Sequence, residues 1–512
     1  MNYNLTDTQK DFAVFLPAIS GFYATFIGKQ RFENYVDPAR VPSSYTHGVE
    51  SLNYLNKDQG QFYYKWSLYS AGHADLDCSK QIDKEDMIRN RDRQQTWLLG
   101  DSGGFQIGKG VWEGDWKDPS CPKASKKRKD VLEWMDNYMD YGMILDVPAW
   151  VSRSEKGQKA TGVTNYQEAV NATRTNNNYW MANRSGACKF LNVLQGENHQ
   201  DAEDWYQQMK DYCDPKKYPN SHFNGWSMGG QNMCDVHLVL KRLIALRFDG
   251  LLEKGVHDVM HFLGTSKLEW AVLLTDIQKT IRKYHNENFM VTFDCASPFL
   301  ATANGQIYIQ NEINDRKKWV YRMVPSIDQL KYANDHRNFK TAVLQDNIFA
   351  NFENSPLTEH IKVNDICIYA EGDKNKIGTP KIKAGNIDRD KNGNPLLDEN
   401  GNQIIRSKDS TSWDSFSYAI QMGHNVWSHI TAVQKANSEY QKNIIPSMLV
   451  QEMFDFITFR DVVDEIFATS DRDKANKVNN NYRKYLDSII GTRGLTGKKM
   501  TNASTYFNKL FT

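Results

Sequence analysis

The sequence predicts an α/β protein organised as a (β/α)₈ TIM barrel, and three observations lead to this prediction. From residue 95 onward, short apolar runs alternate with helical patterns at the spacing of parallel βα units. Several of these runs end in a carboxylate, a carboxamide or a glycine, as barrel strands do where they build an active site. The 512 residues are 40% apolar and 12% aromatic, which suffices for a large core. The spacing also fits an open parallel sheet, which is kept as the alternative.

The chain divides into three parts. Residues 1–90 are rich in aromatic side chains and lack a strong period, so we expect short N-terminal elements that close one end of the barrel. Residues 91–440 form the barrel core, with a polar insertion at about 371–410 whose Asn-Gly turns favour hairpins. Residues 441–512 are expected to form a helical extension.

Periodicity places the individual elements. Strands are expected at 95–100, 141–146, 189–195, 223–228, 258–263 and 289–294. Helices of the core are expected at 130–141, 165–184, 202–213, 235–247 and 267–284. Helices of the extension are expected at 444–459, 461–468 and 474–490.

Charge and cysteine content indicate the setting of the protein. With 63 basic and 62 acidic residues the formal charge is +1, so a nucleic acid would have to bind local basic patches. The seven cysteines are scattered without a C-x-x-C pair, which is typical of a reducing compartment. No signal pattern and no apolar run of about 18 residues occurs, so we expect a cytoplasmic protein without a membrane partner. The sequence carries no signal for an oligomeric state.

The ends of successive predicted strands carry chemically useful groups. Any one of them is more often structural, but the strand end at Asp101 and five later strand ends of the same character predict a site at one face of the barrel. The residues are Asp101, Asp146, Gln195, Gly229, Gly230, Gly264 and Asp294.

These groups suit base exchange at a sugar. Two carboxylates can run a double displacement at a sugar carbon, one attacking while the other carries the proton. A third carboxylate, a carboxamide and glycine N–H groups offer a planar edge to a heterocycle. Phe105 is placed to stack on such a ring, and Leu263 to close its other face.

Four segments, in this order, resemble the guanine transglycosylases that act on tRNA. They are DSGGFQ at 101–106, VLQG at 193–196, MGG at 228–230 and FDCASP at 293–298. The resemblance covers about residues 95–310 and implies a barrel that exchanges guanine in a polynucleotide for a preQ0-like 7-deazaguanine base. The resemblance also implies that the exchange needs no redox cofactor.

By this resemblance, Asp294 is the nucleophile that attacks C1′ of the nucleotide, and Asp101 is the general acid/base. Phe105 and Leu263 sandwich the base, with Leu263 where the family often has methionine. The remaining residues expected to bind the base are Ser102, Asp146, Gln195, Gly229, Gly230 and Gly264.

The chain departs from the tRNA-acting enzymes after the nucleophile. Their Pro-Thr-Arg-Asn-Ala-Arg-Asn-Gly stretch reads the anticodon loop, whereas residues 298–305 here are PFLATANG and contain no arginine. This favours DNA as the polymer. The family has a divergent branch, found in bacteria and their viruses, that inserts 7-deazaguanines into DNA. By this resemblance we expect the protein in the cytoplasm of a bacterium or of a virus-infected cell. A tRNA-acting enzyme, a retaining glycoside hydrolase and a non-catalytic binding subunit remain as alternatives.

Metal binding is predicted to be absent. The family's structural zinc uses C-x-C-x-x-C and a later histidine, but here only Cys367 and His424 match, with Cys121 and Cys213 far away in sequence. Residues 388–399 fit the EF-hand calcium pattern, yet Pro395 and the missing flanking helices argue against calcium.

Two basic regions are candidates for holding nucleic acid. One is a cluster in the loop after the Asp101 strand, formed by Lys123, Lys126, Lys127, Arg128 and Lys129. The other spans residues 472–509. For each, the alternative is a solvated charged surface, or a helical cap at the C-terminus.

Overall fold

The computed structural model describes most of the chain. The described residues are 3–33, 36, 38–82, 85–316, 318–328, 332, 335–346, 355–367, 397, 413–451 and 456–489. The predicted insertion at 371–410, apart from residue 397, and the end of the C-terminal basic region from residue 490 therefore lie outside the described residues, as does nearly all of the EF-hand pattern.

Eight parallel strands form the central sheet. They are β2 (Val14–Pro17), β4 (Trp66–Ser70), β5 (Trp97–Asp101), β6 (Tyr141–Met143), β7 (Lys189–Leu194), β8 (Gly225–Met228), β9 (Val259–Phe262) and β10 (Met290–Cys295). Their order is β2-β10-β9-β8-β7-β6-β5-β4. The strands are almost wholly buried and apolar, as expected when helices cover a parallel sheet.

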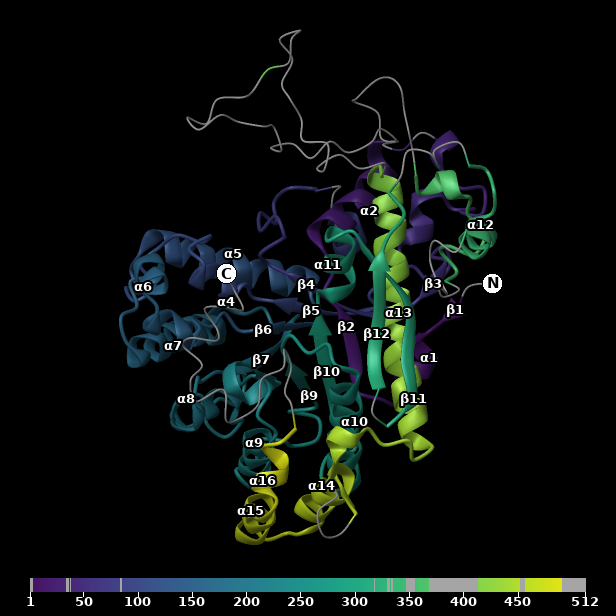
Figure 1. Cartoon of the computed structure of the whole chain (residues 1–512). Coiled ribbons are helices and arrows are strands. Elements are labelled where there is room, and N and C mark those ends of the chain that lie inside the picture. The colour runs from purple at the N-terminus through teal and green to yellow at the C-terminus, as the bar shows by residue number, and fades with distance from the viewer. Residues whose placement is uncertain are drawn as a thin grey trace.

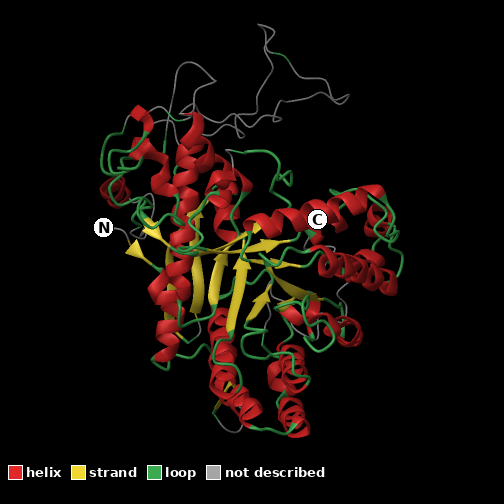
Figure 2. Ribbon diagram, turned by 180° about the vertical axis from the view of Figure 1, so that it is seen from behind, coloured by secondary structure: helices red, strands yellow, loops and turns green. Residues whose placement is uncertain are grey.

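The sheet curves until its two end strands meet. Ala18, just after β2, pairs with Leu68 of β4, and the Ile19 N–H donates to the Leu68 carbonyl oxygen at 2.9 Å. Helices surround the strands on the outside (Figure 1; Figure 2). The predicted α/β architecture is confirmed as an all-parallel sheet that is nearly barrel-shaped and enclosed by helices.

Residues 1–90 contribute two strands of this sheet, β2 and β4, in addition to peripheral elements. The prediction that this segment only closes one end of the barrel is therefore wrong. The peripheral elements are β1 (Tyr3–Asn4), α1 (Thr6–Gln9), α2 (Gly21–Glu33), β3 (Phe62–Tyr63) and α3 (Asp86–Arg89).

The barrel helices follow the predicted order. They are α4 (Gly104–Gly108), α5 (Pro122–Tyr138), α6 (Glu155–Thr161), α7 (Tyr166–Asn183), α8 (His199–Met209), α9 (Val236–Phe248), α10 (Leu268–Tyr284) and α11 (Ser297–Ala303). Side chains of Asn165, Asn198 and Asp235 cap α7, α8 and α9 by accepting backbone N–H groups. These caps fix where each helix begins after its strand.

After the barrel come a hairpin, β11 (Gln306–Asp315) with β12 (Lys318–Pro325), and α12 (Phe339–Asp346). The 27-residue helix α13 (Ser415–Gln441) then packs against β11, α10 and α11 (Figure 1). Asn425 of α13 ties these parts together, because its side chain donates to Thr302 and accepts the Tyr308 N–H at 2.8 Å.

The prediction of a helix at 444–459 is wrong. Asn443 has a positive φ of 64° and ends α13, and Pro446, which lacks an N–H, follows. The segment instead holds a 3-10 turn (Ser447–Leu449) and two short strands, β13 (Val450–Gln451) and β14 (Ile457–Thr458).

Three helices close the described chain: α14 (Phe459–Ala468), α15 (Arg472–Asn481) and α16 (Arg483–Leu486). They pack against α9 and α10 on the outside of the barrel (Figure 1). Among the described helices, none combines the length and apolar character needed to cross a membrane.

Candidate active site

A cavity of about 560 Å³ lies at the carboxyl ends of the barrel strands. This is the end at which barrel enzymes place their catalytic groups. Eight residues predicted from the sequence line it: Asp101, Phe105, Asp146, Gln195, Gly230, Leu263, Gly264 and Asp294. The barrel therefore brings together groups that are spread over nearly 200 residues of sequence.

Asp294 lies near the end of β10 with its side chain 13% exposed. Its Oδ1 accepts the Gly264 N–H at 2.8 Å, and Nε2 of His261 lies 3.2 Å from the same oxygen. Gly264 has a positive φ of 62°, which glycine adopts without strain. The Gly264 hydrogen bond holds Oδ1, whereas Nε2 of His261 lies close to that oxygen without forming a hydrogen bond, so Oδ2 is left for chemistry.

Asp101 ends β5 beside Ser70, the last residue of β4. The Ser70 hydroxyl donates to Oδ2 of Asp101 at 2.7 Å, and the Gly103 N–H donates to Oδ1 at 3.3 Å. Burial raises the pKa of the Asp101 carboxyl, and the charge of Asp294 raises it further, although both hydrogen bonds oppose the shift. Asp101 is thus disposed to carry a proton near an ionised partner.

Asp146 follows β6 and is 6% exposed. The Gln195 Nε2 donates to its Oδ2 at 2.7 Å. Burial raises the pKa of Asp146 to about 7, the Gln195 hydrogen bond opposes this, and the Asp101 charge adds to it. The pair presents a carboxyl and a carboxamide side by side, and its carboxyl changes charge near neutral pH.

The two glycines after β8 have different roles. The Gly229 N–H donates to the Leu194 carbonyl oxygen at 2.8 Å, and Gly229 is not part of the cavity wall. Gly230 lines the cavity with a positive φ of 54°, and a Cβ there would lie 2.3 Å from the Gly196 carbonyl oxygen. The prediction that the Gly229 N–H faces a base is therefore wrong, because a neighbouring strand end already uses it.

Ser102 also lies apart from the predicted wall. It is 1% exposed and is not among the residues that line the cavity. It directly follows Asp101, the last residue of β5.

Apolar side chains form the remaining walls. Phe105, in the first turn of α4, is 40% exposed and lies 6.4 Å from Trp150 between ring centroids. Leu263 lines the cavity directly after β9. Phe299 and Leu300 of α11 also line it, so the segment that lacks the family's arginines adds an apolar surface. A flat ring entering the cavity would meet aromatic and aliphatic groups.

Sequence reasoning missed Ser70 and His261. Ser70 lies in the segment that was not recognised as barrel strand, and its run Trp66–Ser70 is buried throughout. His261 is fully buried in β9, where its Nδ1 lies 2.9 Å from the Thr292 hydroxyl. A histidine three residues before the glycine of a strand end was the available signal.

The basic cluster lies in the first turns of α5, not in a loop. Pro122 starts the helix earlier than predicted, as proline does at a first helical position. Three of the lysines form ion pairs with carboxylates, Lys123 with Glu113, Lys126 with Asp130 and Lys129 with Glu133.

The other two members of this cluster pack inward. Arg128 is 4% exposed, and its Nε donates to Oδ1 of Asn176 at 2.6 Å. The Lys127 ammonium lies 4.9 Å from the Trp112 ring centroid, and Trp112 packs on Gly103 beside the cavity. Arg128 is therefore unable to reach a phosphate, whereas Lys127 contacts a ring that packs against the turn after β5.

Cys367 and His424 do not fit a tetrahedral zinc site. The Cys367 thiol lies 3.6 Å from the Ile327 carbonyl oxygen, and Nε2 of His424 lies 2.7 Å from the Tyr308 carbonyl oxygen. Within the described part of the chain they share no cluster of metal-ligating side chains, and neither do Cys121 and Cys213.

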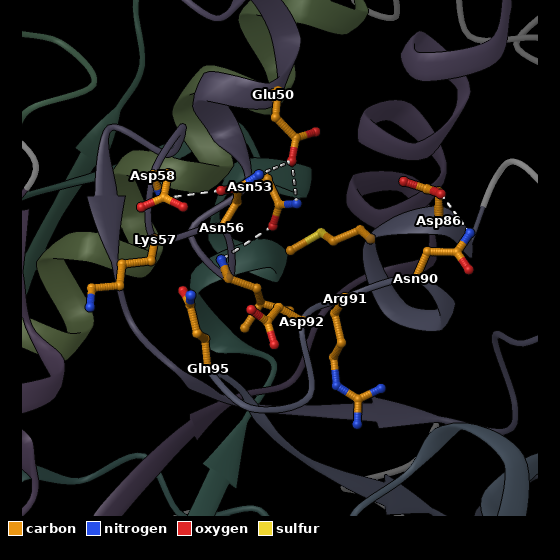
Figure 3. Close-up of a pocket in the computed structure, with 12 residues that line it drawn as sticks. Glu50, Asn53, Asn56, Lys57, Asp58, Asp86, Asn90, Arg91, Asp92 and Gln95 are labelled. Carbon is orange, nitrogen blue, oxygen red and sulfur yellow. Dashed lines mark hydrogen bonds between the residues drawn. The ribbon is translucent and has the colours of Figure 1, made fainter.

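A second, smaller hollow of about 180 Å³ lies at the opposite end of the barrel (Figure 3). Asn90, Arg91, Asp92 and Gln95 line part of it shortly before β5 begins at Trp97, which places it at the amino ends of the strands. Its polar groups bond to one another: the side-chain amides of Asn53 and Asn56 both donate to Glu50 Oε1 at 2.8 Å. This hollow has no part in the site described above.

Comparison with known proteins adds no family. No protein-family model matches the chain, and no curated protein sequence matches it significantly.

Proposed function

We propose that this protein exchanges guanine in DNA for a 7-deazaguanine base through a covalent aspartyl–nucleotide intermediate. The observation that carries the proposal is that Asp101 and Asp294, from strands β5 and β10, line the same cavity as the Asp146–Gln195 pair. Two carboxyl groups with different environments and a third hydrogen-bonded edge are what a double displacement at a nucleoside requires.

In the first half-reaction, Oδ2 of Asp294 attacks C1′ while the bond from C1′ to N9 of guanine breaks. The Gly264 N–H holds Oδ1, which leaves Oδ2 for the attack on the sugar. Asp101 gives its proton to the departing guanine, for which its raised pKa suits it. The product is an ester between Asp294 and C1′.

The second half-reaction reverses these roles. Asp101, now ionised, takes the proton from N9 of the incoming 7-deazaguanine, and N9 attacks C1′. The ester bond breaks and Asp294 regains its carboxylate. No oxidant, reductant or nucleoside triphosphate is consumed, since one glycosidic bond replaces another.

The Asp146–Gln195 pair and the apolar side chains of the cavity wall recognise the base. Ionised Asp146 accepts hydrogen bonds from the N1–H and N2–H groups that guanine and 7-deazaguanine share. Phe105 and Leu263 stack on the two faces of the ring. The apolar Phe299 and Leu300 border a space into which a nucleotide flipped from a duplex, or met in a single strand, can insert.

The choice of DNA rests on the absence of arginine in residues 298–305, because phosphate and anticodon contacts in the tRNA-acting enzymes need those cations. The test is incorporation of labelled guanine or a labelled 7-deazaguanine by the full chain, with DNA and with tRNA as separate substrates. Label in DNA supports the proposal. Label in tRNA alone refutes the DNA assignment, and sugar release without base exchange would indicate a glycoside hydrolase.

A further inference from the structure

A cluster of histidine and carboxylate side chains lies outside the cavity, where the C-terminal helices meet the barrel. One ligand atom each from Asp235, His237 and Asp487 lies within 4.8 Å of the other two. Asp235 caps α9, His237 is in its first turn, and Asp487 follows α16. The cluster therefore joins segments 250 residues apart in sequence.

His237 has an unused nitrogen. The residue is 3% exposed, and its Nε2 lies 3.1 Å from Oδ1 of Asn480. Because this oxygen is an acceptor, Nε2 carries the proton and Nδ1 carries the lone pair, and that buried Nδ1 has no hydrogen-bond partner among the described residues.

The carboxylates are equally suited. Asp235 is 1% exposed, and its Oδ2 lies 2.6 Å from His199 Nε2 and accepts the Gln231 amide at 2.8 Å. Histidine–carboxylate pairs of this kind orient ligands around metals. Within the described part of the chain, the Asp487 carboxylate makes one ion pair, a loose one with Arg483 Nε at 3.6 Å, which leaves its side chain able to turn toward a metal.

We propose that Asp235, His237 and Asp487 bind a divalent transition-metal ion, with Zn²⁺ as the chemical match. One imidazole and two carboxylates are ligands that zinc accepts at about 2.0–2.2 Å. In a tetrahedral site with bonds of this length the ligand atoms stand roughly 3.3–3.6 Å apart, so the three side chains, whose ligand atoms now lie within 4.8 Å of one another, must draw together around the ion. A water completes the tetrahedron, and His199 holds Asp235 from behind.

The site would also brace the cavity. Gln231, which donates to Asp235, follows Gly230 of the cavity wall, and its N–H donates to the Gly196 carbonyl oxygen at 2.8 Å. A metal fixing Asp235 to Asp487 thus connects the C-terminal helices to the turn that lines the cavity. The proposal goes beyond base exchange and differs from the sequence-based expectation of no metal.

The test is titration of the chelator-treated full chain with Co²⁺, followed by competition with Zn²⁺. We expect saturable visible Co²⁺ absorbance with one ion per chain, displaced by Zn²⁺, and a rise in the melting temperature. Asp487→Asn, which keeps the size of the side chain, should weaken binding at least about tenfold. Asp473→Asn removes an exposed carboxylate from α15 and should bind like wild type.

A second variant, His237→Gln, removes a ligand without removing a negative charge. It therefore distinguishes loss of ligation from a purely electrostatic effect of the Asp487 charge. Circular dichroism of both metal-free variants establishes that they fold. Weakened uptake in folded Asp487→Asn and His237→Gln supports the site. Uptake equal to wild type in either folded variant, or absence of saturable uptake by wild type, overturns it; neither outcome bears on base exchange, which is measured separately.

Discussion

Replacing Asp146 with asparagine is expected to stabilise the folded protein at neutral and alkaline pH while removing recognition of the base. The carboxyl of Asp146 is 6% exposed, and burial raises its pKa from 3.8 to about 7. The folded protein therefore holds an ionised Asp146 at a cost that the unfolded chain does not have. Asparagine keeps an oxygen for the Gln195 amide without that charge.

The size of the effect follows from proton linkage. Between pH 3.8 and about pH 7 the folded state binds one more proton at Asp146 than the unfolded state does. Stability at this group therefore falls as the pH rises through that window, by about 1.4 kcal/mol per pH unit and at most about 4 kcal/mol in all. The Asp146→Asn variant lacks this loss, so its advantage grows from pH 4 to pH 7 and then stays level.

Urea unfolding of wild type and Asp146→Asn at pH 5, 6, 7 and 8 measures the difference directly. An exposed control, Asp58→Asn, should show no comparable pH-dependent gain. A gain for Asp146→Asn that is the same at every pH, or a loss of stability at pH 8, would refute the reasoning. Binding of guanine by wild type should weaken as the pH falls below about 7, because the ionised form of Asp146 accepts the base.

Three further predictions concern the walls and the basic helix. Phe105→Ala should raise the KM for the incoming base by an amount equivalent to roughly 1–3 kcal/mol of lost stacking, with folding unchanged in thermal melts. Arg128→Ala should lower the free energy of unfolding by about 1–3 kcal/mol, measured in urea, because it leaves the buried Oδ1 of Asn176 without its donor; unchanged stability would contradict the burial of Arg128. Lys127→Ala should reduce the slope of log affinity for DNA against log salt by about 1, and an unchanged slope would place the strand elsewhere.

The barrel was predictable from the chain because its central strands are apolar runs followed by capped helices. β7 and β10, for example, fall within the predicted ranges at 189–195 and, to within a residue, 289–294. β2 and β4 escaped prediction because residues 1–90 show no strong hydrophobic period, although α2 follows β2 as helices follow the other strands. Their place is decided by pairing with distant strands, such as Asp294 beside Leu16, which local sequence does not encode.

The sequence allowed prediction of those parts of the site that are formed by side chains at the ends of strands. Asp101, Asp146, Gln195 and Asp294 come together because parallel strands all end at one face. The role of Gly229 was not predictable because its N–H donates to the Leu194 carbonyl oxygen, a hydrogen bond that depends on strand pairing.

Arg128 and α13, on the outside of the barrel, also show that local sequence does not determine features that depend on tertiary packing. A run of basic residues predicts charge on a surface, but the turn of α5 that buries Arg128 depends on where the helix begins. α13 went unrecognised because it is mostly buried, so polar residues such as His424 interrupt any simple apolar stripe.

Trapping the covalent intermediate tests the proposed function most directly. Wild type, Asp294→Asn and Asp101→Asn are mixed with guanine-containing DNA, denatured, and examined by mass spectrometry for a peptide joined to DNA through residue 294. The account predicts an adduct with wild type, formed with release of guanine and lost on adding a 7-deazaguanine, and none with Asp294→Asn. An adduct that persists in Asp294→Asn, or one that forms on tRNA and never on DNA, would contradict it.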